Sequence, residues 1–397
     1  MKSLTLLSLL LIGITGFSQS LIFNSGFEPN TDTINQTPSG ADLTGIDNSV
    51  PIPNDWDVFD DSLAPGTFSI QYQGGEDTMR LAEITPDPED PSNNVLKFWV
   101  DYPNVGAAEK SRVQANIYNT DGFDNIFYKT RFYIPNDLDT LKYLPINLRW
   151  FTLMEFWNDP EWELSTTGFR ISVNLYKDST EDYFYFGIHG QTYNESEDKY
   201  EDYWANENKL FEVPTGEWMT IKVHFIEGDD TDGKFWMSCQ PEGESETIVF
   251  DLTEYTHSPF DTGDGPDGLT HFNPLKMYTS AELVDSLRNW GFQCHVYWDD
   301  FALWKDIDPA TVSVAELVVE NSQVYPNPSN GPIAITTTSI FSNAMLNIYD
   351  VQKRLVSYYT GLTGSVFKID PNLPAGIYNY QIIDNNGALS DGKFVIQ

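Results

Sequence analysis

Apolar and polar residues alternate along much of residues 19–308, and this period of two predicts β-strands. The clearest strands are residues 110–118, 169–176 and 183–191, each with one apolar face and one polar face. Further runs of β-branched and aromatic residues predict strands at 127–134, 218–226, 235–239 and 294–304. Hardly any segment has a helical period longer than that of residues 280–290. This pattern predicts an all-β body, a two-sheet jelly-roll sandwich of concanavalin type.

Residues 1–18 have the pattern of a secretory signal peptide. Lys2 supplies the positive charge, residues 4–14 are largely apolar, and Gly16 to Ser18 offer a small-residue cleavage site before Gln19. No later stretch approaches eighteen uncharged apolar residues, so we expect no membrane span in the mature protein. An exported protein of this kind is expected to need no organic cofactor.

The charge balance limits the classes of molecule that the protein is expected to bind. The chain of 397 residues has 59 acidic and 22 basic side chains, a formal net charge of −37. Such a chain repels phosphate, so nucleic acid and anionic membranes are not expected partners. Hydrophobic residues make up 40% of the chain, enough for a sizeable core. The simplest interpretation of the acidic surface is solubility, including in salty surroundings.

Residues 324–397 form a different unit, joined to the body by a predicted linker at 309–323. The unit opens with Tyr325-Pro326-Asn327-Pro328, contains Ala375-Gly376-Ile377-Tyr378, and ends in a KFVIQ sequence at 393–397. It resembles the C-terminal sorting domain of the Bacteroidota type IX secretion system. The resemblance implies a small β-sandwich that carries an address for that machinery, on a protein that is secreted or held at the cell surface. The alternative is an ordinary β-sandwich accessory domain.

The chain has only two cysteines, which excludes a Cys-ligated zinc module and a scaffold held by several disulfides. Alternation places Cys239 and Cys294 on inward faces of their strands. In an exported chain we expect them to form a disulfide. Two separate buried thiols are the alternative.

The polar faces of the three clearest strands carry groups that form hydrogen bonds or stack, rather than the Lys, Glu, Thr and Ser of an ordinary solvated face. If the strands are neighbours, these groups line one concave surface suited to an extended, hydroxyl-rich and anionic ligand, with Trp157, Trp162 or Trp204 stacking on sugar rings at its rim. The groups are Arg112, Gln114, Asn116, Arg170, Asn174, Tyr185, His189 and Gln191. The alternative is a polar sheet face covered by loops.

Here the chain resembles jelly-roll polysaccharide lyases, the alginate, glucuronan and heparin lyase-like group. Residues 183–191 (YFYFGIHGQ) are similar to the alginate lyase strand YFKAGxYxQ, with Tyr185 at its Lys and His189 at its catalytic Tyr. Arg112-Val113-Gln114 is similar to the start of the RxExR strand, with Gln114 at its Glu. Residues 155–158 (EFWN) lie roughly where that family has QxH, and the His is absent. The closing strand, residues 297–304, is common in such sandwiches.

Lyase chemistry requires a group that neutralises a uronate carboxylate, a base for the C5 proton and an acid for the departing O4. His189 is the best base by residue type, and Tyr185 or Tyr193 could serve as the acid. A structural His189 is the alternative, while His224 and His295 sit on less suitable strands. The groups that could bind or neutralise the carboxylate are Gln114, Asn174, Gln191, Arg112 and Arg170.

These features predict a secreted lyase for a uronate-containing polysaccharide such as ulvan, alginate or glucuronan. A non-catalytic carbohydrate-binding protein on the same sheet is one alternative. A glycoside hydrolase is another, although the ExDxxE run of concanavalin-type glucanases is absent. The chain also lacks the GxSxG, HExxH and P-loop motifs.

A structural Ca²⁺ is also expected, because acidic sandwiches often tie their first and last strands with this ion. Asn24 and Glu28 lie near the mature start, and Asp299 and Asp300 lie near the end of the body. The loop at 261–268 is a second candidate, although its Asp and Gly residues are also typical of turns.

Overall fold

The computed structural model describes residues 20–73, 79–101, 110–158, 167–261, 268–307, 322–351, 354–383 and 389–397. The chain divides into two compact units, a body of residues 20–305 and a unit that contains the C-terminal strands. The predicted signal peptide and nearly all of the predicted linker lie outside the described residues, as does Trp162.

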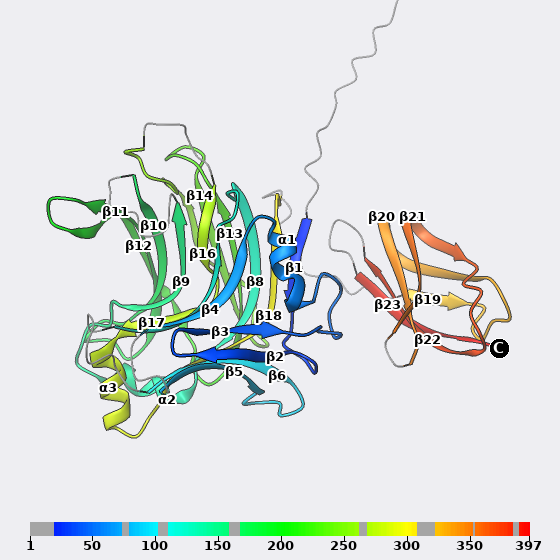
Figure 1. The fold of residues 1–397 in the computed structure, drawn as a ribbon, viewed down its shortest axis with the longest axis horizontal. Helices are drawn as coiled ribbons and strands as arrows, with labels where there is room; N and C mark the ends of the chain where they lie inside the picture. The colour runs from blue at the N-terminus through cyan, green and yellow to red at the C-terminus, as the bar shows by residue number, and fades with distance from the viewer. Residues whose placement is uncertain are drawn as a thin grey trace, which may run out of the picture. The chain divides into compact units, whose positions relative to one another are not determined.

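In the described part of the body, the strands form two antiparallel sheets, and their order shows which strands are neighbours (Figure 1). The eight-stranded sheet has the order β15-β14-β13-β8-β18-β6-β5, and β1 also pairs with β18. Its strands are β1 (Ser20–Ser25), β5 (Arg80–Pro86), β6 (Asn94–Val100), β8 (Asn125–Tyr133), β13 (Trp218–Ile226), β14 (Lys234–Pro241), β15 (Thr247–Thr253) and β18 (Cys294–Lys305).

The ten-stranded sheet has the order β12-β11-β10-β9-β16-β7-β4-β3-β2, and β17 pairs with both β7 and β9. Its strands are β2 (Asp32–Thr37), β3 (Gly40–Thr44), β4 (Thr67–Gln73), β7 (Lys110–Tyr118), β9 (Phe151–Asn158), β10 (Phe169–Tyr176), β11 (Phe184–Asn194), β12 (Lys199–Val213), β16 (Leu269–Asn273) and β17 (Lys276–Ser280).

The core lies between the two sheets. Phe156 of β9 stacks on Phe225 of β13 with ring centroids 5.7 Å apart, so the inner faces of the two sheets are in direct contact. Tyr128 of β8 donates a hydrogen bond to the sulfur of Met154 on β9, at 2.9 Å. Alternation thus sends every second residue of these strands into the core and leaves the others on the outer faces. The prediction of an all-β jelly-roll sandwich is confirmed.

The helices of the body are short. They are η1 (Trp56–Val58), α1 (Phe59–Leu63), α2 (Asn136–Asp139), η2 (Thr140–Tyr143) and α3 (Ala281–Asn289). The hydroxyl of Ser280 caps α3 by accepting a hydrogen bond from the backbone N–H of Leu283, and Leu283, Val284 and Leu287 are buried. The helical period of residues 280–290 therefore predicts α3 correctly.

The predicted disulfide is wrong. Cys239 and Cys294 are separate buried thiols. Strands β13 and β8 lie between β14, which carries Cys239, and β18, which carries Cys294. Three strand spacings are about 14 Å, whereas the Cα atoms of a disulfide lie within about 7 Å. The side chain of Cys294 instead contacts the sulfur of Met277, 3.9 Å away.

The C-terminal unit is a small β domain with its own core. Its strands are β19 (Ser322–Tyr325), β20 (Ile333–Tyr349), β21 (Leu355–Ile369), β22 (Gly376–Ile383) and β23 (Leu389–Ile396). The two long strands, β20 and β21, pair with several shifts of register, which let them bend around the core. That core includes Phe341, Leu346, Phe367, Tyr380 and Phe394.

Candidate functional site

The polar face of the ten-stranded sheet carries most of the predicted site residues, but its strands are not arranged as expected. Strands β10 and β11 are neighbours, with Arg170 opposite Gln191 and Ser172 opposite His189. Strand β7 is separated from β10 by β9 and by β16 and β17 (Figure 1). The three strands therefore share one sheet face, while β9, β16 and β17 contribute additional side chains between them.

His189 is held between two partners. Its Nδ1 lies 3.1 Å from Oδ1 of Asp202, and its Nε2 lies 3.3 Å from the side-chain nitrogen of Asn174. The hydrogen bond from His189 is the largest cause of a lowered pKa at Asp202. A carboxylate at Nδ1 favours the tautomer with its proton there, which leaves the lone pair on Nε2. The His189 side chain is 17% exposed, so it can be reached from solvent.

Arg170 is fixed beside this pair. Its Nε donates to Oε1 of Gln191 at 2.6 Å, and the Gln191 amide donates to Asp202 at 2.7 Å. Its Nη1 lies 3.7 Å from Glu155, and its guanidinium lies 4.3 Å from the ring centroid of Tyr200. The Arg170 side chain is 21% exposed. A planar cation held in this way is preorganised to bind a carboxylate.

Glu155 and Lys276 form a buried ion pair near Arg170, and both side chains are almost inaccessible. Burial alone would raise the pKa of Glu155, but the charges of Lys276 and Arg170 outweigh it and lower that pKa to about 2. Burial, with the nearby Arg112 and Arg170, lowers the pKa of Lys276 to about 8 although Glu155 opposes the change. Glu155 is therefore a fixed anion rather than a proton donor.

Four of these residues were missed by the sequence analysis as members of the site: Asp202, Tyr200, Lys276 and Glu155. Glu155 was noted only as a departure from a family motif, and Lys276 begins a strand of five residues, too short to show a clear period. Asp202 and Tyr200 lie on β12, whose many exposed residues give no alternation that marks one face. Pairing with β11 decides where they lie.

Gln114 and Asn116 lie beneath the surface rather than on it, since both are 0% exposed. The Gln114 amide donates to the Asn116 side-chain oxygen, and Asn273 donates to the same oxygen. Asn273 also contacts His271 and accepts a hydrogen bond from Lys276. This part of the polar face is therefore covered, as in the alternative interpretation. The cluster is linked to Glu155 through Lys276.

Tyr185 and Tyr193 are not placed beside His189. Each is four residues from His189 along β11, which corresponds to about 13 Å between Cα atoms. Tyr185 is fully buried, accepts a hydrogen bond from Arg149 and donates to Asp178 at 3.1 Å. The Tyr193 hydroxyl donates to Asp198. Both phenols are thus engaged elsewhere, and neither is well placed as the acid.

Of the three tryptophans predicted to stack on sugar rings, Trp157 is contradicted by its burial. Trp157 is 0% exposed and lies under Arg170, whose guanidinium is 5.5 Å from its ring centroid. Trp204 packs against Gly190, and its indole N–H donates to the backbone of Tyr255 at 2.8 Å. Trp157 is therefore closed to a sugar, whereas Trp204 is half-buried and has its ring against Gly190.

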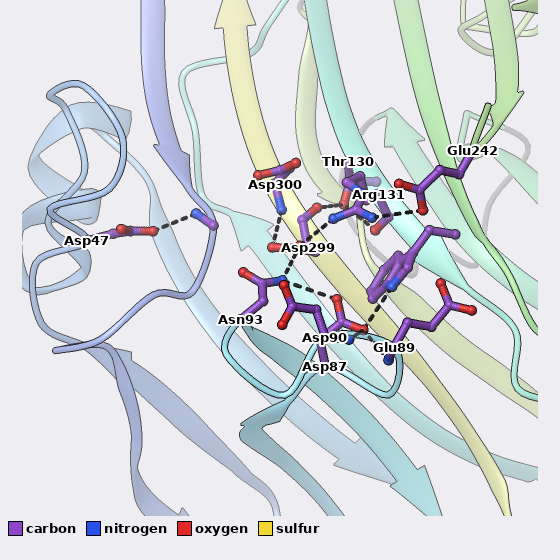
Figure 2. Close-up of polar contacts among 12 residues, drawn as sticks. Asp47, Asp87, Glu89, Asp90, Asn93, Thr130, Arg131, Glu242, Asp299 and Asp300 are labelled. Atoms are coloured by element: carbon purple, nitrogen blue, oxygen red, sulfur yellow. Dashed lines mark hydrogen bonds and ion pairs between the residues drawn. The ribbon is translucent and has the colours of Figure 1, made fainter. Parts of the chain in front are cut away.

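The residues expected to bind calcium come together elsewhere, in an acidic pocket of about 610 Å³ that is lined by the segment between β5 and β6 and by residues of β8, β13 and β18 in the eight-stranded sheet. Glu28, Asp299 and Asp300 all line it. Asp299 is already engaged: it accepts hydrogen bonds from Asn93 and from Arg131, each at 3.1 Å (Figure 2). Asn24, predicted beside them, donates its amide to the backbone of Pro51 and Pro53.

Burial, followed by the neighbouring Asp300, raises the pKa of Asp299 to about 7. In the ranges that the structure describes, no group of three or more His, Cys, Asp or Glu side chains is arranged to hold a metal ion. The carboxylates as they stand do not form a calcium cage, and calcium binding stays a prediction. Most of the second candidate, the loop at 261–268, lies outside the described residues.

Comparisons with known proteins give a clear result for the C-terminal unit and weak ones for the body. No curated protein sequence matches the chain. The marine PL-14 alginate lyase from Aplysia kurodai is 13% identical, with 62% of this chain and 93% of that chain covered and a TM-score of 0.38. The endo-β-1,4-glucuronan lyase from Trichoderma reesei is 14% identical, with 60% and 92% covered and a TM-score of 0.36.

The C-terminal unit is matched by a family model. Residues 323–397 match the secretion system C-terminal sorting domain. None of the helices that the structure describes is long and apolar enough to cross a membrane. Residues 323–397 are therefore a type IX sorting domain, and the chain is a protein exported by that system, either released or attached to the cell surface.

Proposed function

We propose that the body is a polysaccharide lyase that cleaves a uronate-containing polymer by β-elimination. One observation carries the proposal. His189 is partly exposed and contacts Asp202, and it lies on the same sheet face as the fixed guanidinium of Arg170. This arrangement pairs a base with an anion-binding group, which is the combination that proton abstraction beside a carboxylate requires.

A second feature supports an anionic substrate. Among the described residues, four cations interact electrostatically with Glu155: Lys110, Arg112, Arg170 and Lys276. Asp202 is a second carboxylate within reach of Arg170. The remainder of the chain is strongly acidic, with a net charge of −37 overall. A local excess of positive charge in such a protein favours a polymer with carboxylate or sulfate groups at this face.

The proposed reaction assigns a role to each group. Arg170 pairs with the uronate carboxylate and withdraws electron density, which acidifies the C5 proton. Nε2 of His189 takes that proton while Asp202 stabilises the imidazolium. The C5–H electron pair becomes the C4=C5 double bond, the C4–O4 bond breaks, and O4 leaves with a proton from an acid.

Tyr200 is our candidate for that acid. Its ring lies against Arg170 and makes an edge contact with Trp157, at centroid distances of 4.3 Å and 5.5 Å. It lies two residues from Asp202 on β12, so its side chain is directed to the same face. Tyr185 and Tyr193, the tyrosines predicted from the sequence, have hydroxyls already bound to Asp178 and Asp198.

The test is incubation of the purified protein with alginate, glucuronan and ulvan. A lyase product carries a 4,5-unsaturated uronate, which absorbs in the ultraviolet, in step with new reducing ends. Reducing ends without that absorbance would indicate a hydrolase. Glu155 and Asp202 are poor candidates for hydrolysis, because one is locked to Lys276 and the other to His189.

A non-catalytic carbohydrate-binding protein is the second candidate. The burial of Gln114, Asn116 and Trp157 favours it, because the part of this face open to a ligand is smaller than predicted. Retarded migration in gels that contain the polymer, with no product after long incubation, would support this alternative.

A further inference from the structure

The side chain of Tyr176 crosses from its own strand onto the neighbouring one. Tyr176 is the last residue of β10 and lies opposite Tyr185 of β11. Its ring, however, covers Gly187, because its Cζ atom lies 2.8 Å from the point that a Cβ atom of residue 187 would occupy, and Cδ2 and Cε2 lie closer still. Gly187 and His189 are two residues apart on the same face of β11. The ring is therefore directed along β11, from Tyr185 toward His189.

The hydroxyl of Tyr176 is the free end of this side chain. Among the described residues it has no hydrogen-bond partner, and it is not one of the buried polar atoms that lack one, so solvent reaches it although the residue as a whole is only 8% exposed. The hydroxyls of Tyr185 and Tyr193 are each bound to an aspartate. Tyr278 also has a hydroxyl without a partner in the described part of the chain, but it lies on β17, three strand spacings from β11. Tyr176 therefore offers a free hydroxyl on the strand that carries His189.

The ring is held in place without the hydroxyl. The guanidinium carbon of Arg149 lies 5.1 Å from the ring centroid of Tyr176, and the Tyr185 ring makes an edge contact at 6.0 Å. Gly187 supports the ring from the strand side. A hydrogen bond from the hydroxyl to a ligand would therefore cost little side-chain entropy.

His189 lies between Tyr176 and Arg170 on this face. Gly187, His189 and Gln191 follow one another along β11 in steps of two residues, about 7 Å each. Tyr176 covers the first of them, and Arg170 donates a hydrogen bond to the last. A polymer that places one carboxylate at Arg170 and the neighbouring C5 proton at His189 can therefore extend along β11 to Tyr176.

The charges around the Tyr176 hydroxyl favour a neutral group on the ligand. Burial, followed by the charge of Asp202, raises the pKa of Tyr176 to about 12. Glu207 of β12, which lies opposite Gly187, adds to this rise, and Arg149, which pairs with Glu207 at 3.5 Å, opposes it. The phenol is therefore protonated at neutral pH and can donate a hydrogen bond. A second carboxylate of the polymer would be repelled by Asp202 and Glu207, whereas a sugar hydroxyl would not.

We propose that Tyr176 binds the sugar next to the one held by Arg170, by donating a hydrogen bond to a neutral hydroxyl or ring oxygen of that sugar. The proposal rests on the proposed function for the identity of the ligand as a uronate polymer. Tyr176 is a binding residue in it and takes no part in the proton transfers. Gly187 is a positioning residue, because any larger side chain there would displace the ring.

Electrophoresis of the full chain in gels with alginate, glucuronan or ulvan measures the affinity. Tyr176→Phe removes only the hydroxyl and should weaken the affinity for the polymer that binds the wild type about threefold to tenfold. The loss should be the same at low and high salt, because the hydrogen bond joins neutral groups. The melting temperature should not change, since the hydroxyl has no partner in the described part of the protein. Tyr297→Phe, at a half-buried tyrosine of β18 in the other sheet, is the matched control and should bind like the wild type.

A second variant tests the position of the ring. Gly187→Ala keeps the hydroxyl but moves the ring, so it should weaken the affinity as well. Combined with Tyr176→Phe it should cause little further loss, because both changes remove the same hydrogen bond.

An affinity of Tyr176→Phe equal to that of the wild type, or no binding of the wild type to any of the three polymers, would overturn the proposal. A loss that disappears at high salt would do the same, because it would mean that the partner is an anion. Affinity that depends on Tyr176 without any unsaturated product would refute the lyase assignment and leave this proposal standing.

Discussion

The imidazole of His189 and the carboxylate of Asp202 lie 3.1 Å apart, on adjacent strands β11 and β12. The same carboxylate accepts a hydrogen bond from Gln191, which in turn accepts one from Arg170. The base, its orienting acid group and the anion-binding guanidinium are therefore one connected network. Movement of any member would disturb the others. Variants at these residues are therefore expected to differ in which of kcat, KM and melting temperature they change.

Replacement of His189 by alanine should lower turnover about 10²–10⁴-fold, because a positioned general base contributes roughly that much. Polymer affinity and melting temperature should change little, since the side chain is partly exposed. Rates of unsaturated product formation, together with thermal melts, check this. His257→Ala is the control and should keep wild-type turnover. A large fall in melting temperature would instead identify His189 as a structural residue.

Replacement of Asp202 by asparagine should lower kcat at least about tenfold with a smaller change in KM. An amide can donate to Nδ1 and so favour the tautomer with the proton on Nε2, which removes the lone pair from the reactive side. Steady-state kinetics on a single polymer give the separation of kcat from KM. Asp202→Glu keeps the charge and should recover part of the rate. Equal rates for Asp202→Asn and wild type would exclude an orienting role.

Replacement of Arg170 by lysine should raise KM and lower kcat together. Lysine keeps the charge but loses the planar group that stacks on Tyr200 and donates to Gln191, so the carboxylate would be held less firmly before and during the reaction. Kinetics at several polymer concentrations measure both constants. Unaltered constants would show that Arg170 does not contact the substrate.

Replacement of Glu155 by glutamine should destabilise the body by about 3–5 kcal/mol near neutral pH, because it leaves Lys276 buried without its anion. The pKa of Glu155 is about 2 in the folded protein and 4.5 ordinarily, so its stabilisation is complete above pH 4.5 and is lost as the pH falls toward 2. Denaturant unfolding at pH 7 and at pH 3 should show a smaller difference from wild type at pH 3.

The control for this prediction is Glu83→Gln, which removes a partly exposed ion pair with Lys97 and should cost about 0–1 kcal/mol. An equal destabilisation by Glu155→Gln at both pH values would mean that its charge is not what stabilises the fold.

Thiol titration should find two reactive groups in the denatured, unreduced protein and none in the native protein. Burial raises the pKa of Cys294 to about 12 and also raises that of Cys239, so neither is a thiolate at neutral pH. No reactive thiol after denaturation would restore the disulfide that the arrangement of β14 and β18 opposes.

The local pattern of apolar and polar residues was sufficient to predict several strands. Alternation over residues 110–118, 169–176 and 218–226 predicts β7, β10 and β13 with their observed bounds, because each strand has one face in the core and one outside. The C-terminal sorting domain is marked by motifs that are contiguous in the chain, so residues 324–397 identify it without a structure.

The candidate site depended on which strands pair. Alternation correctly places His189, Arg170, Asn174 and Gln191 on one polar face, but it cannot show that Asp202 of β12 reaches His189 or that Lys276 meets Glu155. Those contacts join residues 13 to 121 positions apart, and strand order and register alone bring them together. The same holds for Cys239 and Cys294, which share an inward direction but are kept apart by two intervening strands. A side chain's face is a local property of its strand, whereas its neighbours are a property of the assembled sheet.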